Sequence, residues 1–203
     1  MGFSDARIRT RTIFTVVYVA NRTKSPEAGP LPTRSIVALA GFMGSGKTTV
    51  GQALAELLRW EFVDLDERVE RDQGMAVREI FARRGEAEFR QLEHMTLRSL
   101  VATCSRPTVI ALGGGTFVQP MNESTLHDGQ VISVFLELPV NELLRRCMDC
   151  ATNDNPRPLA ASEEEFRRLY EERLPLYRNA TMTIDTVGKL PEEIAREIAS
   201  RLA

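Results

Sequence analysis

The chain has 203 residues, of which 43% are hydrophobic and 27% are charged, and its formal net charge is −2. This composition is typical of a globular domain that is long enough to bury a substantial core. A net charge so close to zero gives no general attraction for nucleic acid. No apolar stretch approaches the ~20 residues that span a bilayer. We therefore expect one folded domain that binds neither nucleic acid nor membrane.

The first 34 residues differ in composition from the rest of the chain. They hold six basic side chains against two acidic ones, and prolines and a glycine follow at 26–32. We predict a basic, disordered extension over 1–34, followed by the folded domain over 35–203. An Arg-rich, acid-poor start is also the composition of an organelle transit peptide, and an overlong start is a third alternative.

The most informative motif follows the first predicted strand. Residues 35–40 are a short apolar run typical of a buried parallel strand, and residues 49–58 carry apolar side chains at helical spacing. Between them, residues 41–48 (GFMGSGKT) match the phosphate-binding loop pattern G-x-x-x-x-G-K-[ST] at every fixed position. Backbone N–H groups and a helix amino terminus bind phosphates in such a loop. Lys47 is expected to reach the outer phosphates, and the Thr48 hydroxyl to bind Mg²⁺.

Strands and helices alternate over the rest of the chain. Further strands are predicted at 60–64, 108–112, 131–136 and 181–184, helices at 65–73, 77–84, 86–104, 140–150, 163–174 and 191–202, and a polar loop at 151–162. Five strands separated by helices predict an α/β fold whose parallel sheet is covered on both faces. Ligands of such sheets bind beyond the carboxyl ends of the strands. The phosphate loop, the acids at 64 and 66 and the three glycines at 113–115 should therefore meet in one crevice.

Two acids, Asp64 and Asp66, follow the second predicted strand. A kinase needs an acid near its Mg²⁺ and benefits from another that holds or deprotonates the attacking hydroxyl. The strand before the triple glycine ends without the acid that assists the metal in many P-loop enzymes. Asp64 is therefore the candidate for that role. The alternative is that Asp64 or Asp66 only caps the helix that follows.

Three arginines complete the candidate site. Arg90 lies early in the helix predicted at 86–104, and Arg173 lies near the end of the helix predicted at 163–174. Either could be an ordinary surface charge, but together they would offer two guanidinium groups to the carboxylate of an acidic substrate. Arg157 lies in the polar loop, where it would suit a lid that closes over ATP phosphates and excludes water.

The three cysteines form no disulfide framework, which favours a reducing compartment such as the cytoplasm. Cys147 and Cys150 have the C-x-x-C spacing of some metal and redox sites. Because the chain has no second such pair and no histidine nearby, we interpret the spacing as chance.

The sequence resembles the shikimate kinases in six motifs, which occur in the order found in that family over about residues 35–203. They are GFMGSGKT (41–48), FVDLD (62–66), GEAEFR (85–90), LGGG (112–115), RPL (157–159) and RLPLY (173–177). The resemblance implies a P-loop kinase fold of the nucleoside monophosphate kinase type, with a five-stranded parallel sheet in the order 2-3-1-4-5. It also implies ATP-dependent phosphorylation of the shikimate 3-hydroxyl, giving shikimate 3-phosphate and ADP, in chorismate and aromatic amino acid biosynthesis.

The resemblance also implies a role for each matching residue. Asp66 would hold the reacting hydroxyl, as a base or only by orienting it, while Arg90 and Arg173 bind the shikimate carboxylate and Gly114 contacts the ring. Thr48 would bind Mg²⁺ directly and Asp64 through water. Lys47, Asp66 and Arg157 would be catalytic, with Arg157 closing from a lid at about 151–162. The residues expected to bind ATP are Gly44, Ser45, Gly46, Lys47, Thr48, Thr49, Arg157 and, as the nearest candidate for stacking on adenine, Arg146.

Three other functions share part of this pattern. A kinase of gluconate or another small molecule could have the same fold, but a neutral sugar needs no pair of guanidinium groups. A nucleoside monophosphate kinase needs a base-reading pocket, for which the sequence shows no candidate. A nucleotide-binding protein without catalysis would not need the acid pair and the lid arginine. We therefore expect a monomeric enzyme whose partner is the small molecule shikimate.

Overall fold

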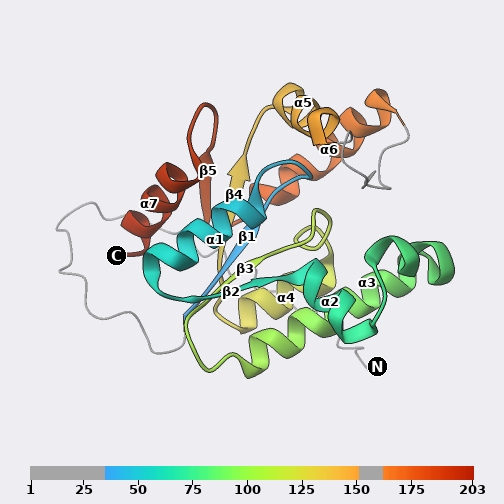
Figure 1. Cartoon of the computed structure of the whole chain (residues 1–203), viewed down its shortest axis with the longest axis horizontal. Coiled ribbons are helices and arrows are strands. Elements are labelled where there is room, and N and C mark those ends of the chain that lie inside the picture. The colour runs from blue at the N-terminus through green and yellow to red at the C-terminus, as the bar shows by residue number, and fades with distance from the viewer. Residues whose placement is uncertain (1–34, 151–161) are drawn as a thin grey trace, which may run out of the picture.

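A computed structural model of the chain describes residues 35–150 and 162–203. Their centre is one sheet of five strands in the order β2-β3-β1-β4-β5, and every neighbouring pair of strands is parallel (Figure 1). The predicted α/β class and the strand order 2-3-1-4-5 are thereby confirmed. The extension at 1–34 and the loop at 151–161 lie outside the described residues.

The elements follow the predicted alternation of strands and helices. The strands are β1 (Ile36–Ala40), β2 (Glu61–Asp64), β3 (Thr108–Ala111), β4 (Ile132–Glu137) and β5 (Met182–Asp185). The helices are α1 (Lys47–Leu58), α2 (Leu65–Gln73), α3 (Val77–Thr103), α4 (Pro120–Asp128), α5 (Val140–Cys150), α6 (Glu163–Tyr177) and α7 (Pro191–Leu202).

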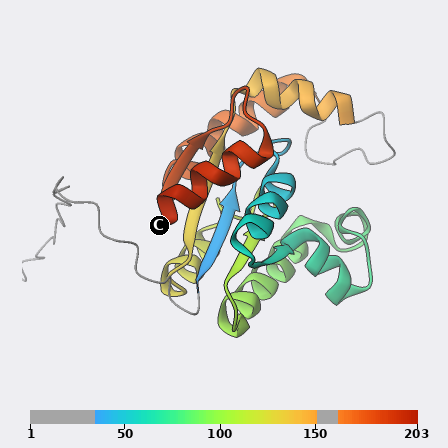
Figure 2. The same ribbon diagram turned by 60° about the vertical axis from the view of Figure 1, so that its left-hand side comes forward.

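The sheet is apolar on both faces, and its central strand shows why. Successive side chains of a strand point to opposite faces. Ile36, Ala38 and Ala40 of β1 pack into the core under α3, α4, α5 and α6. Val37 and Leu39 pack into the core under α1 and α7, which lie together on the other face of the sheet (Figure 2). A strand buried on both sides needs a continuous apolar run, and this is the pattern that made β1 predictable.

Helix α4 was missed by sequence analysis. It begins with Pro120 in its first turn, but its nine residues include few apolar ones, and only Asn122 and Leu126 are buried. With one apolar side chain facing the core, the helix has almost no hydrophobic periodicity. The proline at its first position was the one available signal.

Sequence analysis predicted that one helix ends before Gly85 and another ends at Leu174, and the two predictions differ in outcome. Gly85 has φ 82° and ψ 171°, so α3 is interrupted at the glycine that was expected to separate two helices. Helix α6, in contrast, continues through Pro175 instead of ending at Leu174. A proline costs a helix one hydrogen bond. Burial of Tyr177 in the last turn of α6, stacked 5.2 Å from Phe135, offsets that loss.

None of the helices in the described part of the chain combines the length and the apolar character needed to cross a membrane.

Candidate active site

The phosphate-binding loop joins β1 to α1 at the carboxyl edge of the sheet (Figure 1). Gly41, Gly44 and Gly46 have φ of 151°, 82° and 87°, a range that side chains with a Cβ rarely adopt. A Cβ at Gly41 would also lie 2.7 Å from Ser45 Oγ. Glycine is therefore favoured at these three positions, because it adopts the positive φ that the tight turn into α1 requires.

The polar side chains of the loop point in different directions. Lys47 is buried, and its Nζ donates hydrogen bonds to the carbonyls of Gly41 at 2.9 Å and Phe42 at 3.1 Å. Ser45 is 2% exposed, and its Oγ has no hydrogen-bond partner among the described residues. A buried hydroxyl without a partner costs stability, so a phosphate oxygen at the loop would supply what it lacks. Thr49 is exposed at the start of α1.

Thr48 and Asp64, the two residues predicted to serve the metal, are brought together although 16 positions separate them. Thr48 Oγ1 donates to Asp64 Oδ2 at 2.7 Å, while Asp64 Oδ1 accepts the backbone N–H groups of Asp66 at 3.0 Å and Glu67 at 3.4 Å. Asp64 therefore caps α2 with one oxygen and faces the phosphate loop with the other. The two interpretations of this acid are compatible with each other.

The Thr48 and Asp64 oxygens are hard ligands of the kind that Mg²⁺ prefers. Within 35–150 and 162–203, there is no group of three or more His, Cys, Asp or Glu side chains that could hold a metal alone. In kinases, Mg²⁺ keeps several waters and is shared with the substrate phosphates instead of being enclosed by protein.

The glycine loop, residues 113–115 after β3, lies close to several polar side chains of the candidate site. A Cβ on Gly113 would lie 2.7 Å from Asp66 Oδ1. It would also lie 2.6 Å from Glu93 Oε1 and 2.8 Å from Thr116 Oγ1. Asp66 at the start of α2 and Glu93 of α3 thus approach the backbone at Gly113, where any side chain would push them apart.

Arg90 is held by two carboxylates of its own helix. Its Nη1 donates to Glu93 Oε2 at 2.9 Å, and its Nη2 lies 3.2 Å from Glu86 Oε1. Burial by itself would lower the pKa of Arg90, but the charges and hydrogen bonds of Glu93 and Glu86 outweigh it and raise that pKa. The guanidinium therefore stays charged in a buried position, at a fixed place beside Gly115, whose Cβ would lie 2.6 Å from Arg90 Nη2.

Arg173 approaches the same glycine loop from α6. Its Nη1 donates to the Gly114 carbonyl at 3.2 Å, and its Cζ lies 5.9 Å from the ring centre of Phe42 in the phosphate loop. The hydroxyl of Tyr177 donates to the same carbonyl. Burial raises the pKa of Tyr177 to about 12, although the charge of Arg173 acts in the opposite direction. Arg173 thus contacts both the glycine loop and the phosphate loop.

The phosphate loop and the glycine loop lie beside each other. A Cβ at Gly114 would lie 3.5 Å from the backbone nitrogen of Met43. Asp66, Arg90, Arg173 and Gly114, which were predicted to bind the substrate, therefore lie beside the predicted phosphate site. Two segments far apart in sequence meet because both follow the carboxyl ends of neighbouring parallel strands, β1 and β3.

Arg146, the candidate for adenine contact, lies on α5 beside the phosphate loop. Its Nη1 lies 3.9 Å from the place where a Cβ on Gly46 would be, and its own Cβ lies 3.9 Å from the place where a Cβ on Gly44 would be. The side chain is therefore near the predicted phosphate positions, and whether it stacks on adenine stays a prediction. Arg157 lies outside the described residues.

Sequence analysis missed three polar residues of the crevice, namely Glu93, Thr116 and Tyr177. Each carried a signal. Glu93 stands three positions after Arg90, which is the spacing of an ion pair on a helix face. Tyr177 lies one helical turn after Arg173 and ends the RLPLY motif. Thr116 follows the triple glycine, and its hydroxyl donates to Glu93 Oε1 at 2.5 Å.

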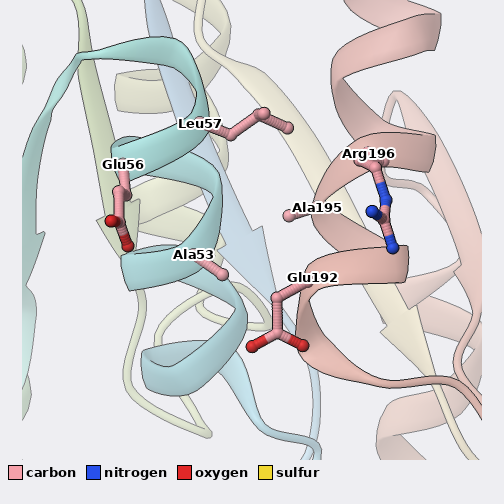
Figure 3. A pocket seen from close by; sticks show the side chains of 6 residues that line it. All are labelled: Ala53, Glu56, Leu57, Glu192, Ala195 and Arg196. Atoms are coloured by element: carbon pink, nitrogen blue, oxygen red, sulfur yellow. The ribbon is translucent and has the colours of Figure 1, made fainter.

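A separate groove lies between α1 and α7, away from these residues (Figure 3). Its lining mixes short apolar and charged side chains, which are Ala53, Glu56, Leu57, Glu192, Ala195 and Arg196. None of the residues of the phosphate loop or the glycine loop reaches it. We therefore do not assign it to the active site.

The family model of shikimate kinase matches residues 43–203. The chain belongs to the shikimate kinase family. It is 35% identical over 165 residues to the shikimate kinase of Persephonella marina, covering 81% of this chain and 96% of that protein. It is 42% identical over 168 residues to the shikimate kinase of Moorella thermoacetica, with 82% and 93% covered.

Solved structures agree with this family. The shikimate kinase from Acinetobacter baumannii in complex with shikimate has a TM-score of 0.76 and 37% identity to this chain, covering 84% of this chain and 93% of that one. A gluconokinase from Sinorhizobium meliloti has a TM-score of 0.53 at 19% identity, and therefore shares only the fold. The predicted family is confirmed, and with it a kinase that uses ATP to phosphorylate shikimate in aromatic amino acid biosynthesis.

Proposed function

We propose that the crevice transfers the γ-phosphoryl group of ATP to the 3-hydroxyl of shikimate. The observation that carries this proposal is that the two loops lie beside each other. An acid, Asp66, and two guanidinium groups, Arg90 and Arg173, lie around a glycine backbone that is close to the phosphate loop at Met43. Such a site can hold a small hydroxylated carboxylate against a bound triphosphate.

The phosphate loop would bind the donor. Its backbone N–H groups and the amino terminus of α1 would surround the phosphates. Lys47 would exchange its carbonyl partners, Gly41 and Phe42, for phosphate oxygens and would offset negative charge on the transferring group. The buried Ser45 hydroxyl would gain a partner in the same step.

Magnesium fits the oxygen pair on the donor side. The Thr48 hydroxyl would bind the ion directly and Asp64 would hold one of its waters, as their 2.7 Å contact across the loop supports. When bound, the ion would neutralise negative charge on the phosphates.

The acceptor side would position the hydroxyl. Asp66 would accept a hydrogen bond from the 3-hydroxyl, and the two arginines would bind the carboxylate through their planar guanidinium groups. The backbone at Gly114 would contact the ring. Because phosphoryl transfer depends mainly on positioning and charge neutralisation, these contacts are sufficient to direct the hydroxyl toward the phosphorus atom.

Further roles complete the proposal. Arg157 would close over the phosphates from a lid at about 151–162, and Arg146 would contact the nucleotide from α5. We also propose that the enzyme works as a monomer in the cytoplasm. Size-exclusion chromatography with light scattering would test the oligomeric state.

A coupled assay for ADP release tests the reaction. ATP and Mg²⁺ are supplied in every reaction, together with shikimate, gluconate or no acceptor. We expect ADP release that depends on shikimate, and product analysis that gives the 3-phosphate. An enzyme that responds to gluconate and ignores shikimate would overturn the proposal. Arg90→Ala should raise the shikimate Michaelis constant, and an unchanged constant would remove Arg90 from the substrate site.

A further inference from the structure

None of the roles above uses the hydroxyl of Tyr177. This side chain is wholly buried in the last turn of α6, four positions after Arg173. Its ring stacks on Phe135 with centres 5.2 Å apart and on Phe117 with centres 6.4 Å apart. The two rings fix the direction of the phenol group, and its hydroxyl reaches the Gly114 carbonyl in the glycine loop.

The Gly114 carbonyl accepts two hydrogen bonds from one helix. Besides the hydroxyl of Tyr177, it receives Nη1 of Arg173 at 3.2 Å. A carbonyl oxygen has two lone pairs, so two donors saturate it. The two donors differ in what else they can do. Arg173 is half-buried and has five N–H groups, whereas Tyr177 has a single O–H enclosed in the core.

We propose that Tyr177 is a positioning residue of the substrate half, which holds the Gly114 carbonyl in place while Arg173 turns its donors toward the carboxylate of the substrate. The inference rests on the proposed function, because it requires an acidic substrate bound by Arg173. With the phenol in place, the guanidinium can leave the carbonyl, and this half-buried acceptor still keeps one hydrogen bond. The glycine backbone therefore keeps its position through the binding step.

The state of the phenol supports this role. Burial raises its pKa to about 12, so the hydroxyl keeps its proton and remains a donor throughout the pH range of enzyme assays. The aromatic stack supports the role as well, since a phenylalanine at this position would keep both ring contacts. Tyr177→Phe therefore removes the hydroxyl and little else.

The same helix offers a matched control. Tyr170 is also buried in α6, and its hydroxyl donates to a backbone carbonyl, that of Leu138, at 3.1 Å. Leu138 follows β4 and does not belong to the glycine loop. Tyr170→Phe therefore deletes the same kind of hydrogen bond from the same helix, away from the predicted carboxylate site.

The experiment compares the wild-type chain, Tyr177→Phe and Tyr170→Phe in the ADP-release assay. Each is assayed at least about 15 °C below its own melting temperature, so that destabilised protein remains folded. For Tyr177→Phe we expect the shikimate Michaelis constant to rise roughly three- to tenfold, the range that the loss of one hydrogen bond corresponds to. Its ATP Michaelis constant should stay at the wild-type value, and its kcat should change less than about twofold. Tyr170→Phe should keep both constants.

Two outcomes would overturn the inference. A Tyr177→Phe enzyme with the wild-type shikimate constant and only a lower melting temperature would make the residue purely structural. Equal changes in the shikimate constant for the two tyrosine variants would trace the effect to α6 as a whole. A wild-type chain that releases no ADP with shikimate would instead refute the proposed function, so the two failures are distinguishable.

A double-mutant cycle with Arg173→Lys tests the mechanism itself. If the phenol holds the Gly114 carbonyl while Arg173 turns to the substrate, the two substitutions should be coupled, and their combined effect on the shikimate constant should differ from the product of the single effects. Fully independent effects would contradict this division of roles.

Discussion

The buried carboxylate of Glu93 offers the sharpest test of how the acceptor side is built. Glu93 is 0% exposed, and its two oxygens accept from Arg90 Nη1 at 2.9 Å and from Thr116 Oγ1 at 2.5 Å. The substitution Glu93→Gln keeps the size of the side chain but removes its charge. It also replaces one accepting oxygen with an NH₂ group that cannot accept. If the amide turns its NH₂ group toward Thr116, the hydroxyl can rotate to accept from it, and the amide oxygen still accepts from Arg90. The substitution therefore removes mainly the buried negative charge that pairs with Arg90.

The size of the effect follows from these contacts. A hydrogen bond to a charged group contributes about 1.5–3 kcal/mol. Arg90 keeps Glu86, but that side chain is 57% exposed, and such pairs contribute at most about 1 kcal/mol. We therefore expect Glu93→Gln to lower the free energy of unfolding by about 2–3 kcal/mol. For a domain of this size, that corresponds to a fall of roughly 4–12 °C in melting temperature.

Substrate binding should weaken together with stability, because the guanidinium that loses its buried charged partner is the one expected to bind the substrate. We expect the shikimate Michaelis constant to rise about tenfold or more and the ATP constant to stay unchanged. Urea denaturation and steady-state kinetics measure the two effects. The control is Glu88→Gln on the same helix, where a 48% exposed carboxylate pairs with Arg84. If Glu93→Gln behaves like this control, the buried pair does not organise the site.

Three further predictions test other parts of the molecule. Asp66→Asn should lower kcat by roughly 10²–10⁴-fold with ATP affinity kept, and near-normal turnover would exclude the residue from catalysis. Gly115→Ala should raise the shikimate Michaelis constant and spare that of ATP, because the new Cβ would begin 2.6 Å from Arg90 Nη2; wild-type kinetics would show that the guanidinium moves freely. Lys189 holds the pKa of Glu197 below its ordinary value, so their pair adds stability above about pH 4.3 that disappears as the pH falls through the lowered pKa. In urea denaturation, Glu197→Gln should therefore lower the free energy of unfolding by less than about 1 kcal/mol at pH 7, because solvent screens the pair, and should not lower it at pH 2. Equal losses of unfolding free energy at both pH values would contradict the linkage.

Much of the fold was predictable, because its signals are local. The apolar run of β1, the glycines around Lys47 and the helix break at Gly85 each follow from the conformations those residues allow. The parallel sheet followed from the alternation of strands and helices. Where the local signal was weak, prediction failed. Helix α4 has almost no apolar face. The last turn of α6 lies beyond Pro175, and it depends on the burial of Tyr177, a tertiary contact that the local sequence does not show.

For the candidate site, the sequence by itself determined which chemical groups are present, and the tertiary structure decided which of them meet. The motifs identified Asp66, Arg90 and Arg173 as candidates for an acidic substrate, because their residue types and order match a known family. The spacing of Arg90 and Glu93 on one helix was a signal for their ion pair, but their partners in other segments could not be derived from spacing. Thr116 donates to Glu93, and Arg173 and Tyr177 share the carbonyl of Gly114. These are contacts between segments that the tertiary structure brings together, and burial then decides which polar groups must pair.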